Sequence, residues 1–165
     1  MFKEIRVYEE TLRRGLEWSQ YIQVTPRSFN NGQRIVVGTI GEAIFHQMLP
    51  GATYSAKNNW DYDFLFCDLR VDVKTSLVRR RPTSHYEVGV FKDPNKQNVD
   101  YFAYFALLND FKTAWFLGAI SREAFAGLCE YRPAGATRGD GKELLYEGWF
   151  VKAYQLEPLK FINYW

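Results

Sequence analysis

The chain has 165 residues, a formal net charge of +2 and a hydrophobic content of 47%. This length predicts a single domain with enough apolar residues to form a core. The small net charge excludes a strongly basic polyelectrolyte, so any contact with nucleic acid would depend on local patches. Cys67 and Cys129 are far apart and form no CxxC pair, which argues against a structural zinc site and against a disulfide framework.

Membrane and nucleotide-binding signals are missing from the sequence. No segment reaches about 18 uninterrupted apolar residues, and charged residues stand at the N-terminus where a signal peptide needs an apolar run. We therefore expect a soluble, intracellular (cytoplasmic) protein that does not associate with membranes. The glycine-rich segment 135–142 lacks the GxxxxGK[ST] spacing of a P-loop, so no nucleotide cofactor is expected.

Hydrophobic periodicity and turn residues predict a series of helices and strands. In chain order these are a helix over residues 3–18, a loop over 25–32, a helix over 34–48, strands over 61–67, 69–75, 85–90, 100–108 and 113–120, a helix over 121–129 with Ser121 as its N-cap, and a strand over 149–156. This order favours an α/β domain with a mixed central β-sheet flanked by helices. The domain is expected to span residues 1–165, with the first helix as an N-terminal extension.

The two short predicted strands between residues 60 and 75 carry the main functional signal. Side chains alternate along a strand, so Asp72 and Lys74 are expected on one face of the sheet. Asp61 and Asp63, in the preceding strand, also share a face. An ammonium group beside carboxylates on a sheet is suited to holding a divalent metal next to a phosphate.

These residues follow an order that is known from a nuclease family. Glu42 lies in the second predicted helix, Asp63 in the first strand of the hairpin, and Asp72-Val73-Lys74 in the second. In this respect the chain resembles the PD-(D/E)XK nuclease superfamily, which includes restriction endonucleases and small phage and bacterial endonucleases. The resemblance covers roughly residues 35–120, although no proline precedes Asp63. It implies a restriction-endonuclease-like fold.

The resemblance also implies a reaction and a ligand set. It implies an endonuclease that hydrolyses phosphodiester bonds in DNA with water activated by Mg²⁺, for which Mn²⁺ would substitute. Asp63, Asp72, Glu42 and the carbonyl of Val73 would hold the metal. Lys74 would position or deprotonate the water and stabilise the developing charge, and the second role is the better supported one.

Some assignments remain open at this point. Asp61 is an alternative to Asp63 as the first metal ligand, and Asp63 is favoured because it lies nearer the hydrophobic run that enters the sheet. His46 lies one helical turn after Glu42, and it is either a second metal ligand or, as we expect, a helix-face histidine that bonds a neighbour. Gln97 is expected near the rim of the site.

The basic run Arg79-Arg80-Arg81 follows the proposed catalytic strand. It is either a solvated loop or a phosphate-binding element, and its position favours the second interpretation. Family members often dimerise to cut both strands, so a homodimer is expected, and the chain itself is bacterial or phage-encoded by the same resemblance. Two other functions remain open. One is a catalytically inactive nuclease-fold module that binds DNA, and the other is an interaction protein with an aromatic surface.

Overall fold

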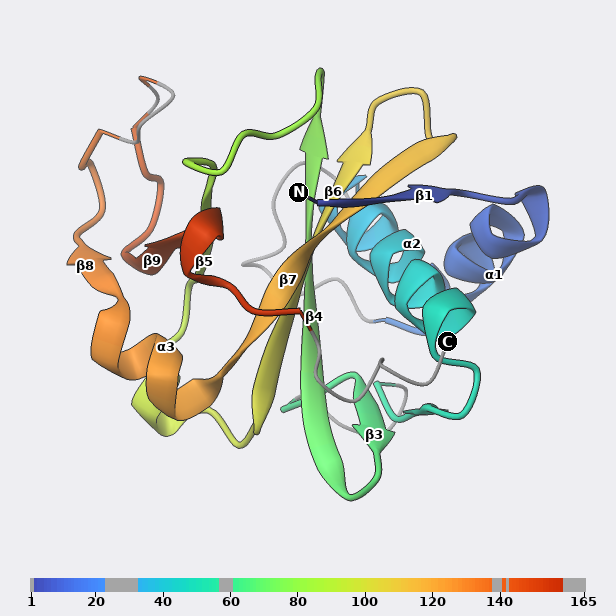
Figure 1. The fold of residues 1–165 in the computed structure, drawn as a ribbon, viewed down its shortest axis with the longest axis horizontal. Coiled ribbons are helices and arrows are strands. Elements are labelled where there is room, and N and C mark those ends of the chain that lie inside the picture. Colours follow the sequence, from blue (N-terminus) through green and yellow to red (C-terminus); the bar gives the residue numbers. More distant parts are fainter. Residues whose placement is uncertain (1, 23–32, 57–60, 138–140, 142, 159–165) are drawn as a thin grey trace.

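The computed structural model describes residues 2–22, 33–56, 61–137, 141 and 143–158. Its centre is a six-stranded sheet with the strand order β1-β7-β6-β4-β3-β2 (Figure 1). The strands are β1 (Lys3–Arg6), β2 (Thr53–Tyr54), β3 (Phe64–Phe66), β4 (Leu69–Val78), β6 (Tyr101–Leu108) and β7 (Thr113–Ser121). The β4–β6 pair is parallel and the other pairs are antiparallel, so the predicted α/β domain with a mixed sheet is confirmed.

The two faces of this sheet are covered differently. Helix α2 (Gln33–Met48) packs on β4 and β6, and α1 (Glu9–Ser19) packs on α2. The opposite face carries α3 (Arg122–Leu128) and a second, three-stranded sheet with the order β5-β9-β8. Its strands are β5 (Glu87–Val90), β8 (Glu130–Arg132) and β9 (Gly148–Lys152). In Figure 1 these two layers lie on the right and on the left of the central strands.

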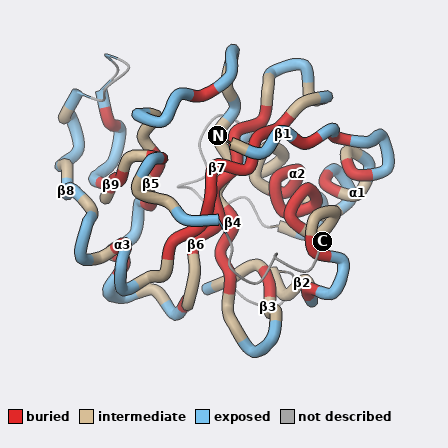
Figure 2. The backbone as a smooth tube through the Cα atoms, in the orientation of Figure 1, coloured by how far each residue is buried: buried red, intermediate tan, exposed pale blue. Residues whose placement is uncertain are grey.

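Strand β6 shows why the sheet needs both layers. Its residues are buried almost without interruption, as expected for a strand with two covered faces. Ala103, Phe105 and Leu107 join the core on the α2 side, whereas Phe102 and Tyr104 join the core on the other side. Figure 2 shows the resulting buried residues running along the central strands and along α2.

Helix α2 approaches β4 so closely that one position accepts no side chain. A Cβ atom placed on Gly41 would lie 1.6 Å from Oγ1 of Thr75. Any larger residue at position 41 would therefore push the helix away from the strand. Because Glu42 is the next residue, this close approach also sets the position of its carboxyl group relative to β4.

The hairpin between β3 and β4 has the tight turn that the sequence predicts. Phe66 pairs with Leu69, which leaves Cys67 and Asp68 as a two-residue loop. Both loop residues have positive φ angles, 48° and 63°. A two-residue hairpin turn with two positive φ angles matches the twist of the strands it joins.

Several predicted boundaries are wrong. Residues 3–6 are a strand rather than the start of the N-terminal helix, because Ile5 is buried while β1 adds to the edge of the sheet beside β7. Lys3–Arg6 therefore belong to the central sheet, and the helical part of the predicted N-terminal segment is α1. Strand β3 begins only at Phe64, so Asp61 and Asp63 precede it, and β9 ends at Lys152, where a 3₁₀ turn, η3 (Ala153–Gln155), follows.

Other elements are as predicted or are new. Ser121 caps α3, and its Oγ accepts a hydrogen bond from the amide of Ala124 at 3.2 Å. The short strands β2 and β8 were not predicted. The predicted loop at 25–32 lies outside the described residues. Among the helices that the structure describes, none combines the length and the apolar character needed to cross a membrane.

Candidate active site

Strand β4 places the Asp-x-Lys pair on the face of the sheet that is turned away from α2. Val71 and Val73 point into the core beneath α2, so the alternation puts Asp72 and Lys74 on the opposite side. The Nζ atom of Lys74 donates to the Asp72 carboxylate at 2.7 Å. Asp72 is only 5% exposed, so its charge depends on neighbouring groups rather than on water.

Asp63 is fixed against the same strand. Its amide donates to the carbonyl of Val71 at 3.0 Å, and its Oδ2 accepts a hydrogen bond from the amide of Val73 at 2.7 Å. The side chain therefore crosses from one arm of the hairpin to the other. Asp61 is exposed and lines the same pocket, whereas the hydrogen bond to the Val73 amide belongs to Asp63. This geometry supports Asp63 as the inner acid of the pair.

Glu42 approaches from α2 and is 6% exposed. The hydroxyl of Tyr54, in β2, donates to Oε2 of Glu42 at 2.8 Å. The Tyr54 ring in turn stacks on Trp18 of α1, with the ring centroids 3.8 Å apart and the planes inclined by 7°. Glu42 is thus oriented by a tyrosine that is itself fixed by stacking. Tyr54 was not predicted as a site residue, because a strand of two residues has no readable periodicity.

Burial and the repulsion between neighbouring carboxylates raise the pKa values of two of the three acids. Burial, with a smaller contribution from the charge of Asp72, raises the pKa of Glu42 to about 7. Burial and the charges of Glu42 and Asp72 also raise the pKa of Asp63 well above its usual range. Burial alone would lower the pKa of Lys74, but the neighbouring carboxylates outweigh it and the pKa is raised. Lys74 therefore remains a cation at neutral pH.

The donor set suits a hard divalent cation. Three carboxyl groups face a single ammonium group, and a cation with oxygen ligands would relieve their repulsion. Among the residues that the structure describes, however, no three His, Cys, Asp or Glu side chains converge in a ready metal-binding geometry. Each acid instead accepts a hydrogen bond from the protein. A metal would compete with these donors for the same oxygens.

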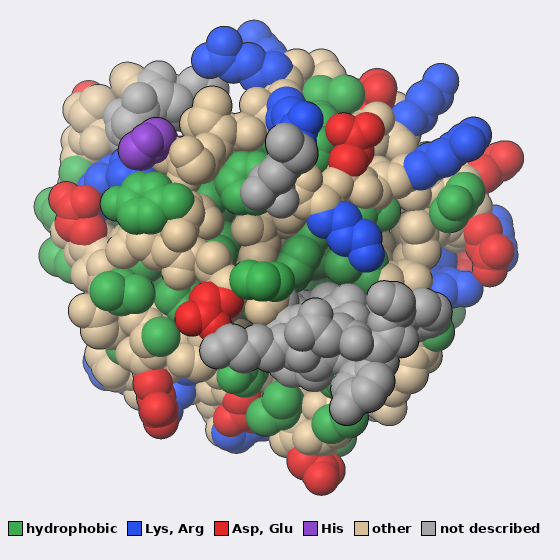
Figure 3. Space-filling view, in the orientation of Figure 1, with side chains coloured by type: hydrophobic (Ala, Val, Ile, Leu, Met, Phe, Trp, Pro, Cys, Tyr) green, Lys and Arg blue, Asp and Glu red, His purple; other side chains and the backbone are tan. Residues whose placement is uncertain are grey.

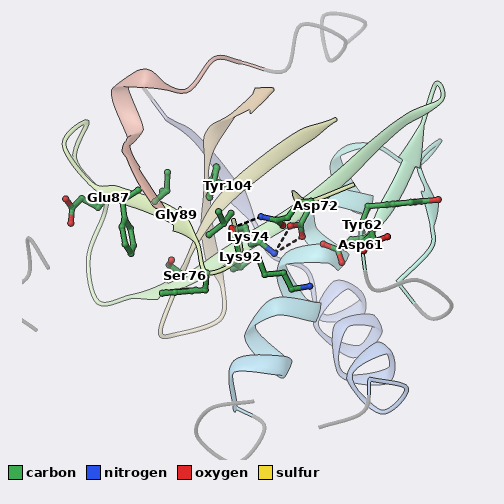
Figure 4. A pocket seen from close by; sticks show the side chains of 16 residues that line it. Asp61, Tyr62, Asp72, Lys74, Ser76, Glu87, Gly89, Lys92 and Tyr104 are labelled. Carbon is green, nitrogen blue, oxygen red and sulfur yellow. Dashed lines mark hydrogen bonds and ion pairs between the residues drawn. The ribbon is translucent and has the colours of Figure 1, made fainter. Parts of the chain in front are cut away.

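A pocket of about 380 Å³ opens on this cluster (Figure 4). The segment Asp61–Asp63 and the motif residues of β4 line one part of it, and β5 lines another. Gln97 belongs to the lining, as the sequence predicts. Tyr104, which pairs with Lys74 across the parallel strands, also lines it and was not foreseen. Its pKa is raised by burial and by Asp72, so its hydroxyl stays protonated and can donate.

His46 does not belong to the pocket lining. Its Nδ1 lies 2.9 Å from Nη1 of Arg14, and its ring meets Trp18 edge-on with a centroid distance of 6.0 Å. Burial and the charge of Arg14 lower the pKa of His46. The structure thus shows the expected helix-face histidine that bonds a neighbour.

The arginine run also lies apart from the pocket. Arg79, Arg80 and Arg81 are exposed and follow the C-terminal end of β4. Because an extended strand rises about 3.3 Å per residue, the run begins about 16 Å beyond Lys74. On the face seen in Figure 3, Lys and Arg side chains are spread out rather than gathered into one patch. Phosphate contact by this run remains a prediction, and it would require a substrate that extends well past the acids.

No family model matches this chain, and no curated protein matches its sequence. Function therefore has to be inferred from the geometry and chemistry of the site.

Proposed function

We propose that this protein is a metal-dependent endodeoxyribonuclease of the PD-(D/E)XK type. The observation that supports the proposal is the meeting of four charged groups from three parts of the chain. Glu42 comes from α2, Asp63 from the segment before β3, and Asp72 and Lys74 from β4. A mixed sheet with an acid-bearing helix packed on the motif strand agrees with a restriction-endonuclease-like fold.

The residues divide into metal ligands and a fixed cation. Asp63, Asp72, Glu42 and the Val73 carbonyl would hold Mg²⁺ or Mn²⁺. When bound, the metal would supply a nucleophilic water and neutralise charge on the phosphate. Lys74 would stabilise the negative charge that develops on the phosphoryl oxygens. Its raised pKa favours this electrostatic role over that of a general base, because the ammonium group keeps its proton.

Cleavage of supercoiled plasmid tests the proposal. We expect nicking with Mg²⁺ or Mn²⁺, none with EDTA, and a loss of about 100-fold or more in Lys74→Ala, because one electrostatic stabiliser of a transition state contributes that much. Lys112→Ala is the matched control, since Lys112 is exposed at the β6–β7 turn. Equal cleavage by the Lys74→Ala variant would overturn the assignment.

A second candidate is a nuclease-fold module that binds DNA without cutting it. The ion pair between Asp72 and Lys74 favours it, because a pair at 2.7 Å keeps both groups occupied in the absence of metal. Such a module would bind DNA with a marked salt dependence but would neither cleave it nor take up Mg²⁺ in a calorimetric titration. Saturable Mg²⁺ binding together with cleavage would exclude it.

The proposal includes a homodimer if the substrate is duplex DNA, because one active site cuts one strand at a time. A dimer mass in light scattering, maintained on dilution, would support this arrangement. A monomer mass over a broad concentration range would exclude it and would favour a substrate with one strand to cut.

A further inference from the structure

The pocket continues past the acid cluster along the same face of the sheet. Beyond Asp72 and Lys74, the lining includes Ser76 of β4, Tyr104 of β6 and Gly89 of β5 (Figure 4). Phe91, the residue after β5, also belongs to it. None of these four residues is among the proposed metal ligands. The pocket therefore has a part that serves something other than the metal.

Tyr104 belongs to the lining of this second part and carries a buried hydrogen-bonding group. It is 2% exposed, and its hydroxyl has no hydrogen-bond partner among the described residues. Its ring packs against Phe102 and Phe125, with centroid distances of 6.5 Å to each, so the side chain is held in place. A buried hydroxyl without a partner destabilises a fold, and phenylalanine would fill the same space without that penalty. The hydroxyl is explained if a bound molecule supplies its partner.

The opposite wall offers aromatic surface and a free cation. Phe91 is 53% exposed and meets Phe150 edge-on at a centroid distance of 6.1 Å. Lys92, the next residue, is exposed, lines the pocket and forms no ion pair with any described residue. Gly89 lets Phe150 pack closely against this wall, because a Cβ atom at position 89 would lie 2.6 Å from the Phe150 ring. An aromatic face beside a cation is the usual means of holding an unstacked base and its backbone.

The size of the pocket excludes a double helix. A volume of about 380 Å³ between two sheets is at the small end of the range for single small-molecule ligands, and a duplex would have to stay outside it. A base can enter a pocket of this size only from a single strand or after it has turned out of the stack of a duplex.

We propose that this part of the pocket binds one unpaired nucleotide, and that the substrate is therefore single-stranded DNA or an unpaired segment within a duplex. The phosphate lies at the acid cluster, the base lies against Phe91, and the Tyr104 hydroxyl donates a hydrogen bond to the bound nucleotide. The position of the phosphate rests on the proposed nuclease function, whereas binding of the base does not. With only one strand to cut, a monomer suffices.

The experiment compares three labelled substrates of the same sequence: a single strand, a duplex, and a duplex with a three-nucleotide unpaired bulge. Cleavage with Mn²⁺ and binding in EDTA by fluorescence anisotropy are measured in parallel. We expect the single strand and the bulge to be cut at least about tenfold faster than the duplex, with the bulge cut at its unpaired nucleotides. Tyr104→Phe and Phe91→Ala should each weaken binding of the single strand by about tenfold, the scale of a lost base contact.

Stability measurements separate a binding role from a structural one. Tyr104→Phe should melt at the same or a higher temperature than the parent protein, because it removes an unpartnered buried hydroxyl. Tyr8→Phe is the matched control, since Tyr8 is exposed before α1 and should change neither binding nor cleavage. A marked loss of stability in Tyr104→Phe would show that the hydroxyl serves the fold, and would overturn its assignment to the ligand.

The outcomes distinguish the two proposals. Cleavage of duplex and single strand at equal rates, with no effect of Tyr104→Phe, would overturn the nucleotide site and leave the nuclease intact. Binding of the single strand that depends on Tyr104 and Phe91, without cleavage of any substrate, would support the nucleotide site and overturn the nuclease. Failure to bind the single strand in EDTA and with Mn²⁺ would overturn the nucleotide site.

Discussion

Two clusters of charged side chains each contribute residues to the same pocket, and they are built in opposite ways. In the second sheet, Glu87 accepts hydrogen bonds from Arg132 and Lys152 at 2.8 Å, and Arg132 also binds Glu130 at 2.8 Å. Among the described residues, two acids there meet two bases. At the motif strand, three of the described acids meet one lysine, and two of these acids have raised pKa values.

The difference indicates what each cluster is for. A balanced set of ion pairs around the largely buried Glu87 and Arg132 satisfies itself and joins β5, β8 and β9 into one sheet. Strand β5 of this sheet lines the pocket. An unbalanced set of buried acids costs stability unless a cation joins it. A protein keeps such a set where it binds or transforms something. Disturbing the balanced cluster should therefore destabilise the fold, whereas neutralising a charge of the unbalanced cluster should stabilise the metal-free protein.

The largest effect is expected from breaking the balanced cluster. Arg132→Ala should lower the free energy of unfolding by about 3 kcal/mol, because it removes the two hydrogen bonds that Arg132 donates to the largely buried Glu87 carboxylate. Urea denaturation measures this. The control is Arg13→Ala, whose ion pair with Glu17 is exposed and should contribute less than about 0.5 kcal/mol. Equal effects of the two substitutions would show that the Glu87 network is not structural.

Metal should stabilise the unbalanced cluster. Mg²⁺ at 100 times its dissociation constant should raise the free energy of unfolding by about 2.7 kcal/mol if it binds only the folded state. The increase should disappear in Asp63→Asn, which keeps the shape of the side chain and removes its charge. Thermal melting over a series of Mg²⁺ concentrations measures this, with Na⁺ at matched ionic strength as the control. A melting temperature that does not respond to Mg²⁺ would contradict the metal site.

Neutralising Glu42 should make the metal-free protein more stable. Its folded pKa of about 7 lies above the usual 4.5, so the folded state holds the proton more tightly than the unfolded state. The free energy of unfolding should therefore fall as the pH rises from about 4.5 to about 7, and it should stay low above that range. Glu42→Gln should remove this loss and gain about 2 kcal/mol at pH 8.

Urea denaturation in EDTA at pH 5, 6, 7 and 8 measures the effect. Glu9→Gln is the control, because Glu9 is exposed in the first turn of α1 and its substitution should leave the pH profile unchanged. A Glu42→Gln protein that is less stable than the parent at pH 8 would mean that the carboxylate serves the fold.

The smallest effect is expected from Tyr54→Phe. Losing one hydrogen bond to Glu42 should cost about 1 kcal/mol of stability, while the stacking on Trp18 is kept. That bond lowers the folded-state pKa of Glu42. In the variant, the fall in stability should therefore extend to higher pH. Weaker orientation of a ligand should also reduce Mg²⁺ affinity by about tenfold, which calorimetry would detect. An unchanged affinity would show that Tyr54 does not position Glu42 for a metal.

The sequence by itself determined the local parts of the site. Alternation along one strand was enough to place Asp72 and Lys74 together, and the tight turn before them could be read from the length of the hairpin. The cap of α3 at Ser121 was equally local. These features depend on backbone geometry over a few residues, so neighbours in the sequence suffice to predict them.

Tertiary structure decided everything that depends on distant residues. The pairing of β1 with β7 joins two segments that are far apart in the sequence, and no local periodicity encodes it. The same holds for the contact of Tyr54 with Glu42, and for the second sheet that turns an open face into a pocket. Tyr104 is the clearest case. In sequence it is one aromatic residue in a buried strand, and only the packing around it leaves its hydroxyl without a partner.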